Sequence, residues 1–245
     1  RCRRCGLIYS NPRPTQGELA RYYNKEYFEE VSYETDPKRL AMYHMEIATM
    51  KKTVPMKGRF LDVGCAYGRF LSLLPDSLER LGIEFSREAA EHGRQLYGLN
   101  IAVGKLSQSN FEDRSFDIIH MRSVIEHMED PFRDLSTAHR LLKRDGWMIV
   151  SNTPNIGGPC GRFYGQDFRL VFPIEHIYYF STQTLSEMLR KAGFEPVHTF
   201  YPYWGTPYAS VAKDAVAFLW NKLAGKQSPP FWHSVMAIYA RKVEA

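Results

Sequence analysis

The chain has 245 residues, 44% of them hydrophobic and 14% aromatic, which is enough to bury one substantial core with a small appended lobe. Its formal net charge of +5 comes from lysines and arginines spread along the chain, which favours a solvated surface over a nucleic-acid footprint. The sequence shows neither a membrane-spanning apolar run nor a secretory signal pattern, so we expect a cytoplasmic protein without membrane insertion.

The chain opens on a Cys-x-x-Cys-Gly knuckle that contains Cys2 and Cys5. Such a turn presents two thiolates to zinc, but a closed structural site needs four ligands, and no second pair follows. Because the chain begins with Arg rather than Met, we expect residues upstream that could supply the missing half. For the chain as given we predict no metal site, and we expect its four scattered cysteines to be reduced thiols.

Residues 1–56 are predicted to form this remnant of a knuckle and then a helical cap without strands. Thr15 and Glu18 have the spacing of a capping box at the start of a helix, and apolar side chains recur at mostly helical spacing over residues 36–53. The first of these two helices carries three tyrosines, Tyr22, Tyr23 and Tyr27.

From residue 57 onward, apolar strands alternate with amphipathic helices. The predicted strands span residues 59–64, 78–86, 99–106, 115–123, 147–154, 195–203 and 234–243. The predicted helices span residues 69–74, 86–98, 130–146, 181–194 and 209–225. This alternation favours a parallel sheet covered on both faces, with residues 57–245 as one α/β domain that contains a late excursion at 201–225.

The loop after the first of these strands, in LDVGCAYGRFL, indicates the kind of ligand that the sheet binds. Gly64 and Gly68 are spaced G-x-x-x-G, unlike the G-x-G-x-x-G of dinucleotide-binding folds, and Asp62 precedes the turn. A carboxylate beside a pyrophosphate is unfavourable, whereas beside an ammonium group it is favourable. The loop therefore favours S-adenosylmethionine, which has an ammonium group and no phosphate. Glu84, at the end of the next strand, can accept hydrogen bonds from both ribose hydroxyls.

These segments resemble the class I S-adenosylmethionine-dependent methyltransferases, in their small-molecule branch. LDVGCAYGRFL and GIEFS look like the first two motifs, SFDIIHMRSVIEHMEDP resembles the fourth-strand region, and LLKRDGWMIVSNTPN the fifth. The opening segment resembles the zinc-ribbon tail of some sugar C-methyltransferases, with only one of its two cysteine pairs present. The resemblance implies a Rossmann-like doubly wound sheet of seven strands, mostly parallel with an antiparallel last strand.

The resemblance also assigns cofactor-binding positions along the carboxyl ends of the first four strands. They are Asp62, Gly64, Cys65, Ala66, Gly68, Glu84, Phe85, Leu106, Met121, Arg122 and Ser123. Ala66 stands where many members of the family have Gly, and we expect its φ to be negative, which an alanine tolerates.

His176 is the main candidate for a catalytic base, because it follows a glycine-rich loop on the cofactor side of the predicted sheet. A neutral imidazole there could take a proton from the methyl acceptor, with Glu175 orienting it. His127 is a second candidate. The competing interpretation is that His176 pins its loop to the following helix and that His127 packs locally.

We therefore predict a transferase that moves a methyl group from S-adenosylmethionine to oxygen or carbon of a small molecule or glycoconjugate. Two alternatives remain: a nucleic-acid methyltransferase with a zinc-ribbon reader, and a cofactor-binding regulator without catalysis. An NAD-dependent oxidoreductase is disfavoured by the absent third glycine and by Asp62.

Overall fold

The computed structural model describes residues 1–15, 17–18 and 36–244. The predicted capping box forms, since the Thr15 N–H donates to Glu18 Oε2 at 2.8 Å and the Glu18 N–H donates to Thr15 Oγ1 at 3.3 Å. The three tyrosines that we expected on this helix lie outside the described residues.

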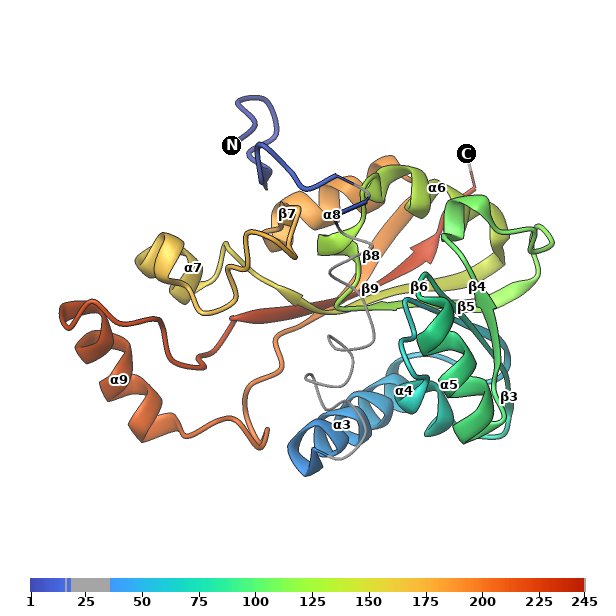
Figure 1. Cartoon of the computed structure of the whole chain (residues 1–245), viewed down its shortest axis with the longest axis horizontal. Helices are drawn as coiled ribbons and strands as arrows, with labels where there is room; N and C mark the ends of the chain where they lie inside the picture. Colours follow the sequence, from blue (N-terminus) through green and yellow to red (C-terminus); the bar gives the residue numbers. More distant parts are fainter. Residues whose placement is uncertain (16, 19–35, 245) are drawn as a thin grey trace.

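A seven-stranded sheet forms the centre of the described structure, in the order β4-β3-β2-β5-β6-β9-β8 (Figure 1). The strands are β2 (Gly58–Val63), β3 (Leu78–Glu84), β4 (Asn100–Val103), β5 (Phe116–Arg122), β6 (Leu142–Pro154), β8 (Phe194–Phe200) and β9 (Val235–Lys242). The pairs from β4 to β6 are parallel, and β9 is antiparallel to both β6 and β8. This confirms the predicted doubly wound sheet with an antiparallel last strand.

Helices cover both faces of the sheet, and each face has its own apolar core. The helices are α3 (Pro37–Thr53), α4 (Arg69–Ser72), α5 (Arg87–Tyr97), α6 (Pro131–Leu141), α7 (Pro159–Tyr164), α8 (Thr182–Lys191) and α9 (Val211–Leu223). Leu61 and Ile119 face the core that includes α6 and α8, whereas their neighbours Phe60 and Ile118 face the core that includes α3, α4 and α5. The predicted helical cap therefore shares a core with the sheet.

Two predictions about secondary structure were wrong. The helix predicted over residues 130–146 ends at Leu141, because the fully buried Leu142 already pairs with Phe116 of β5. The N-terminal segment does contain a strand, since β1 (Ile8–Tyr9) pairs antiparallel with β7 (Tyr178–Tyr179). Tyrosine and β-branched residues favour strands, and β7 consists of two tyrosines preceded by Ile177.

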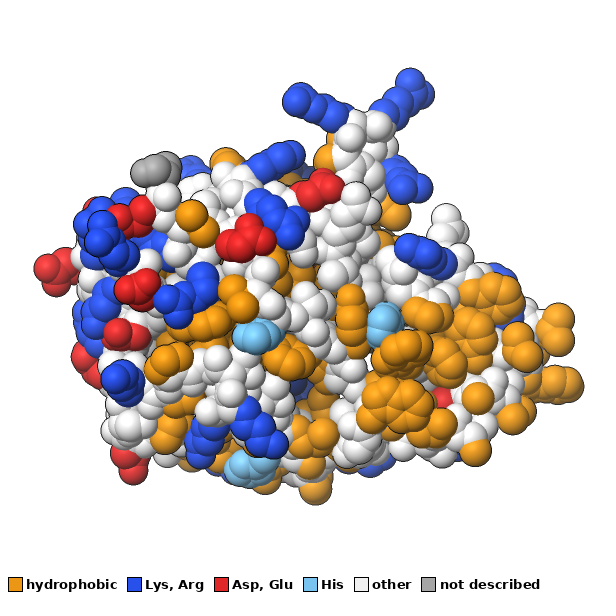
Figure 2. All heavy atoms as spheres, turned by 180° about the vertical axis from the view of Figure 1, so that it is seen from behind, with side chains coloured by type: hydrophobic (Ala, Val, Ile, Leu, Met, Phe, Trp, Pro, Cys, Tyr) orange, Lys and Arg blue, Asp and Glu red, His pale blue; other side chains and the backbone are white. Residues whose placement is uncertain are grey.

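The excursion between β8 and β9 ends in α9, which presents several large apolar side chains to solvent. Figure 2 shows hydrophobic side chains gathered on one side of the molecule. Those exposed on α9 are Val211, Val216, Leu219, Trp220 and Leu223. Among the described residues, no helix is both long enough and apolar enough to cross a membrane.

Candidate functional site

A cavity of about 780 Å³ opens at the carboxyl ends of β2, β3, β5 and β6. Most of the residues predicted to bind the cofactor line it: Gly64, Ala66, Glu84, Phe85, Leu106, Arg122 and Ser123. The three catalytic candidates, His127, Glu175 and His176, line it as well. The other predicted positions are not among its lining residues: Asp62, Cys65, Gly68 and Met121.

The glycine loop after β2 adopts a conformation that its glycines make possible. Gly64 has a φ of +66°, and a Cβ at this position would lie 2.6 Å from the Val124 side chain. The Glu84 carboxylate holds the loop to β3, since it accepts from the N–H of Ala66 at 2.9 Å and from the N–H of Ser86 at 2.9 Å. Burial raises the pKa of Glu84.

The expected negative φ at Ala66 was wrong, because its φ is +49°, in the left-handed region. A left-handed conformation costs a residue with a Cβ about 1–2 kcal/mol, whereas a glycine loses about 0.5–1 kcal/mol in chain entropy instead.

We expect Ala66→Gly to raise the free energy of unfolding by about 0.5–1 kcal/mol in urea denaturation. The matched control is Ala215→Gly, on exposed turns of α9, which should lower it by about 1 kcal/mol. If the free energy of unfolding of the Ala66→Gly protein is lower than that of the parent, the left-handed conformation does not strain Ala66.

Asp62 lies beneath the cavity and contacts a buried histidine. Its register partner on β5 is His120, which is fully buried and whose Nδ1 lies 2.9 Å from Asp62 Oδ1. The Nε2 of His120 lies 2.9 Å from Ser151 Oγ and 3.2 Å from Oε1 of Glu46, on α3. Since its carboxylate contacts His120, the proposed role of Asp62 toward an ammonium group stays a prediction.

Arg122 completes this buried charge network, because its Nε donates to the other oxygen of Glu46, Oε2, at 2.9 Å. The guanidinium also lies over the Tyr43 ring, 4.6 Å from its centroid. The neighbouring carboxylates of Asp62 and Glu46 raise the pKa of His120 to about 9 against the effect of burial. Arg122 and His120 lower the pKa of Glu46 to about 2, likewise against burial. Two carboxylates and two cations therefore compensate one another under the cavity.

Acidic side chains from α6 and the preceding loop contact residues that follow β4 on the cavity wall. Lys105 binds Glu129 with 3.0 Å between Nζ and Oε2, and its ammonium lies 5.4 Å from the centroid of the Phe85 ring. Asp134 Oδ1 accepts from the Ser107 N–H at 3.0 Å. Glu129 and Asp134 thus bring acidic groups to this part of the cavity from 24 and 27 residues along the chain.

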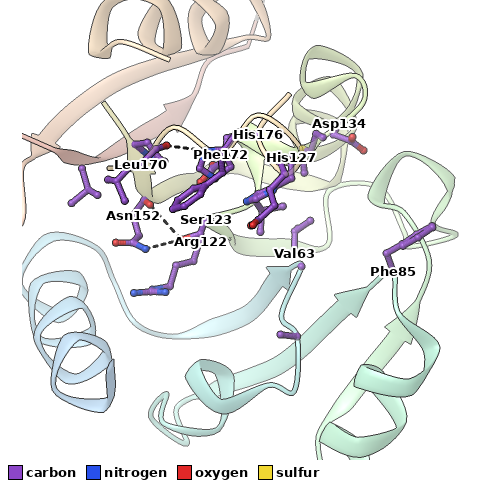
Figure 3. A pocket seen from close by; sticks show the side chains of 18 of the residues that line it. Val63, Phe85, Arg122, Ser123, His127, Asp134, Asn152, Leu170, Phe172 and His176 are labelled. Atoms are coloured by element: carbon purple, nitrogen blue, oxygen red, sulfur yellow. Dashed lines mark hydrogen bonds between the residues drawn. The ribbon is translucent and has the colours of Figure 1, made fainter. Parts of the chain in front are cut away.

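At another side of the cavity, His127 and His176 contact each other edge to face, with 4.7 Å between ring centroids. Figure 3 shows both rings beside Phe172, together with Arg122 and Ser123. His127 Nδ1 lies 2.9 Å from the carbonyl oxygen of Glu175, and His176 Nδ1 lies 3.1 Å from that of Leu170. A carbonyl only accepts, so each Nδ1 carries the proton and each Nε2 carries the lone pair.

Burial lowers the pKa of His127 to about 3, with a contribution from His176, and that of His176 to about 4. Both imidazoles are therefore neutral at pH 7. The Leu170 carbonyl holds the Nδ1 of His176, and the expected orienting role of the Glu175 carboxylate stays a prediction. The backbone carbonyl of Glu175 accepts from His127.

The knuckle at Cys2 and Cys5 closes as a turn, in which the Gly6 N–H donates to the Cys2 carbonyl at 3.0 Å. Both thiols are free, and backbone hydrogen bonds from Cys5 and Arg4 lower the pKa of Cys2. Within the described residues, no third metal-binding side chain joins them in a cluster. The interpretation of this pair as half of a zinc site stays a prediction, as does a complete zinc ribbon.

Glu46, Asn152 and His120 were not among the residues predicted for the site. Glu46 looked like an ordinary polar position on a helix, and Asn152 like the end of a strand, where its Nδ2 donates to Ser123 Oγ at 2.6 Å (Figure 3). His120 did carry a signal, because a polar residue inside the apolar run FDIIHMR of a covered parallel strand must have a buried partner.

Comparison with known proteins agrees with the sheet and the cavity. The model of a family described as "Methyltransferase domain" matches residues 17–199. A ubiquinone/menaquinone biosynthesis C-methyltransferase of Citrifermentans bemidjiense is 27% identical in an alignment 178 positions long, which covers 58% of this chain and 73% of that protein. A ubiquinone biosynthesis O-methyltransferase of Cereibacter sphaeroides is 27% identical in an alignment 193 positions long, which covers 67% of this chain and 74% of that protein.

Among solved structures, a methyltransferase of Thermotoga maritima, titled as a possible histamine N-methyltransferase, matches with a TM-score of 0.65. It is 24% identical, and the match covers 93% of this chain and 99% of that one. The sheet order, its antiparallel last strand and the loop-lined cavity thus define a Rossmann-like methyltransferase fold. The chain belongs to the methyltransferase-domain family, and its cofactor is S-adenosylmethionine.

Residues of the cavity fit this cofactor. The Glu84 carboxylate offers oxygen acceptors for hydroxyl groups, and Phe85 and Leu106 offer apolar contact for a planar ring. The left-handed Gly64 brings backbone close to Val124, so that no side chain fills the cavity floor at that point.

Proposed function

We propose that the protein transfers the methyl group of S-adenosylmethionine to an oxygen or carbon atom of a small molecule, and that the acceptor loses its proton at the pair His127 and His176. The observation that carries this proposal is the presence of two neutral, anchored imidazoles on the wall of the cofactor cavity. The cofactor supplies an electrophilic methyl group, for which alignment with the acceptor contributes most of the rate. The C- and O-methyltransferases among the relatives support carbon and oxygen as acceptor atoms.

The rest of the cavity suits a partly aromatic acceptor. Phe172 and Phe231 line it with apolar rings, while Tyr203, from the excursion, lines it with a hydroxyl that donates to Asp214 at 2.9 Å. From the other side, α3 contributes Arg39 and Met42. Aromatic walls with a few polar groups are typical of small-molecule sites. A glycoconjugate acceptor would require the sugar to reach this cavity.

Cofactor binding at this site can be tested through Glu84. We expect Glu84→Ala to weaken the binding of S-adenosylhomocysteine by about 10- to 100-fold in isothermal titration calorimetry, because hydrogen bonds to a charged group contribute about 1.5–3 kcal/mol. The control is Glu79→Ala on the same strand, whose exposed side chain pairs with Arg59. If Glu84→Ala binds the nucleoside within twofold of the parent, the proposed cofactor position is incorrect.

The acceptor proposal is tested by incubating the protein with tritium-labelled methyl donor and sets of phenols, enolisable ketones and sugars. Label in a small-molecule product supports the proposal. Label found only in added RNA or DNA would favour the nucleic-acid alternative, and no label with any acceptor, despite tight S-adenosylhomocysteine binding, would favour the regulator.

A further inference from the structure

Glu126 joins the two histidines in a compact cluster on the cavity wall. Its carboxylate, the ring nitrogens of His127 and the ring nitrogens of His176 offer one ligand atom each, all within 4.8 Å of one another. The three residues come from two distant segments, η2 (Ile125–His127) and the loop before β7. A backbone hydrogen bond from the Ile177 N–H to the Glu126 carbonyl, at 2.9 Å, fixes one segment against the other.

Each side chain of the cluster makes a hydrogen bond outside the cluster, which helps to fix its orientation. The Nδ1 atoms of both histidines donate to backbone carbonyls, which fixes the tautomer with the lone pair on Nε2. The hydroxyl of Thr153 donates to Glu126 Oε2 at 3.3 Å. Histidine ligands of metals almost always donate their other nitrogen to such a group, and ligating carboxylates are hydrogen-bonded in turn.

The composition of the cluster also fits a cation. Glu126 is 1% exposed, so its carboxyl group lies away from solvent beside the two imidazoles. Two imidazoles and one carboxylate, with further positions open to a cavity, form the donor set of catalytic zinc and non-haem iron sites.

We infer that Glu126, His127 and His176 bind a divalent transition-metal cation, such as Zn²⁺, Fe²⁺ or Co²⁺, on the wall of the cofactor cavity. Ligand distances of about 2 Å would draw the three side chains together by about 1 Å. The binding of the cation does not depend on the proposed function, whereas its role does. With the cation bound, the two Nε2 lone pairs serve as ligands, and the pair acts on the acceptor through the metal. A hydroxyl of the acceptor that coordinates the cation would exchange its O–H bond for an O–metal bond, and the proton would leave to solvent rather than to an imidazole. The acceptor oxygen, or its carbon if it is enolic, then forms a bond to the methyl group as the S–CH3 bond breaks and S-adenosylhomocysteine leaves.

The test uses the full chain carrying Cys2→Ser and Cys5→Ser, so that no thiolate of the knuckle binds metal. After treatment with EDTA and desalting, the protein is titrated with Co²⁺ and followed by visible absorption, and with Zn²⁺ by calorimetry. We expect one Co²⁺ per chain with d–d bands of a nitrogen and oxygen site. Loss of one outer-shell partner costs about 10- to 100-fold in affinity, so loss of a ligand in Glu126→Gln, His127→Ala or His176→Ala should cost more than about 100-fold.

His44→Ala, which removes an exposed histidine of α3, is the matched control and should bind Co²⁺ like the parent. Circular dichroism and S-adenosylhomocysteine binding are measured on every variant, so that a ligand variant that fails to fold is replaced by His176→Gln or His127→Gln. Unchanged Co²⁺ affinity in the folded ligand variants, or no one-to-one binding by the parent, overturns the inference. S-adenosylhomocysteine binding and label transfer report on the methyltransferase separately, so that failure of the metal site and failure of the proposed function give different results.

Discussion

Replacing His176 by Ala is expected to lower the rate of methyl transfer by about 100-fold or more, because removal of an acceptor proton contributes about 10²- to 10⁴-fold to such reactions. The imidazole is 5% exposed, lines the cavity and is anchored through Nδ1 to the Leu170 carbonyl. It therefore presents the same atom to every acceptor. Since Glu84 and the glycine loop lie elsewhere on the cavity wall, S-adenosylhomocysteine affinity should change by less than about threefold, a difference below 1 kcal/mol.

The measurement is single-turnover transfer of labelled methyl to the acceptor identified by the screen, with nucleoside binding measured on the same protein. His198→Ala serves as the control, because this exposed histidine of β8 stacks on Trp147, away from the cavity. A His176→Ala protein that keeps more than a third of the parental rate would show that the histidine only pins its loop. A loss confined to nucleoside affinity would contradict the role as well.

Replacing Glu46 by Ala is expected to destabilise the protein by about 3–5 kcal/mol, the usual cost of breaking a buried ion pair from one side. The side chain is 13% exposed and contacts both His120 and Arg122. Without it, Asp62 is the carboxylate of this network that remains to compensate the charges of His120 and Arg122. Urea denaturation at pH 6 measures the effect. The control is Glu91→Ala, whose exposed pair with Arg87 on α5 should contribute less than about 0.5 kcal/mol.

The difference in stability between the parent and Glu46→Ala should depend on pH in a defined way. Glu46 has a lowered pKa of about 2 in the folded protein, so its contribution is present above about pH 4.5 and is lost as the pH falls toward 2. His120 has a raised pKa of about 9, so its contribution is complete below about pH 6.5 and is lost as the pH rises through 9. The difference should therefore be largest near pH 5 to 6 and shrink on both sides. A difference that stays constant from pH 3 to 9 would exclude the charge network as its source.

The sequence predicted the sheet well, because continuous apolar strands between capped helices leave few alternative topologies. Asp130 and Ser181 show this for the helices, since each is the first residue of a predicted helix and caps a helix that begins at the next residue. The end of α6 was missed because Leu142 is apolar in either state, and only its pairing with Phe116 decides for the strand. The pattern of residues around Leu142 gives no information about its pairing with Phe116.

For the site, the sequence predicted residues at the strand ends that do line the cavity, such as Gly64 and Glu84. It failed where the side chain's partner lies far along the chain. The spacing of LDVG indicates nothing about His120, which is 58 residues from Asp62, or about Glu46, which is 74 residues from His120. A positive φ at Ala66 was likewise set by the contacts of the loop rather than by the residue itself.

The hydrogen bond from the Ser10 hydroxyl to the carbonyl of His176, at 3.0 Å, lies next to the pairing of β1 with β7. We therefore expect binding or removal of the first ten residues to affect the backbone position of His176, which lines the cavity. If zinc completes the knuckle at Cys2 and Cys5, its occupancy would be transmitted to His176 through one short strand. An intact N-terminal segment in the purified sample therefore matters for every rate that is measured with that sample.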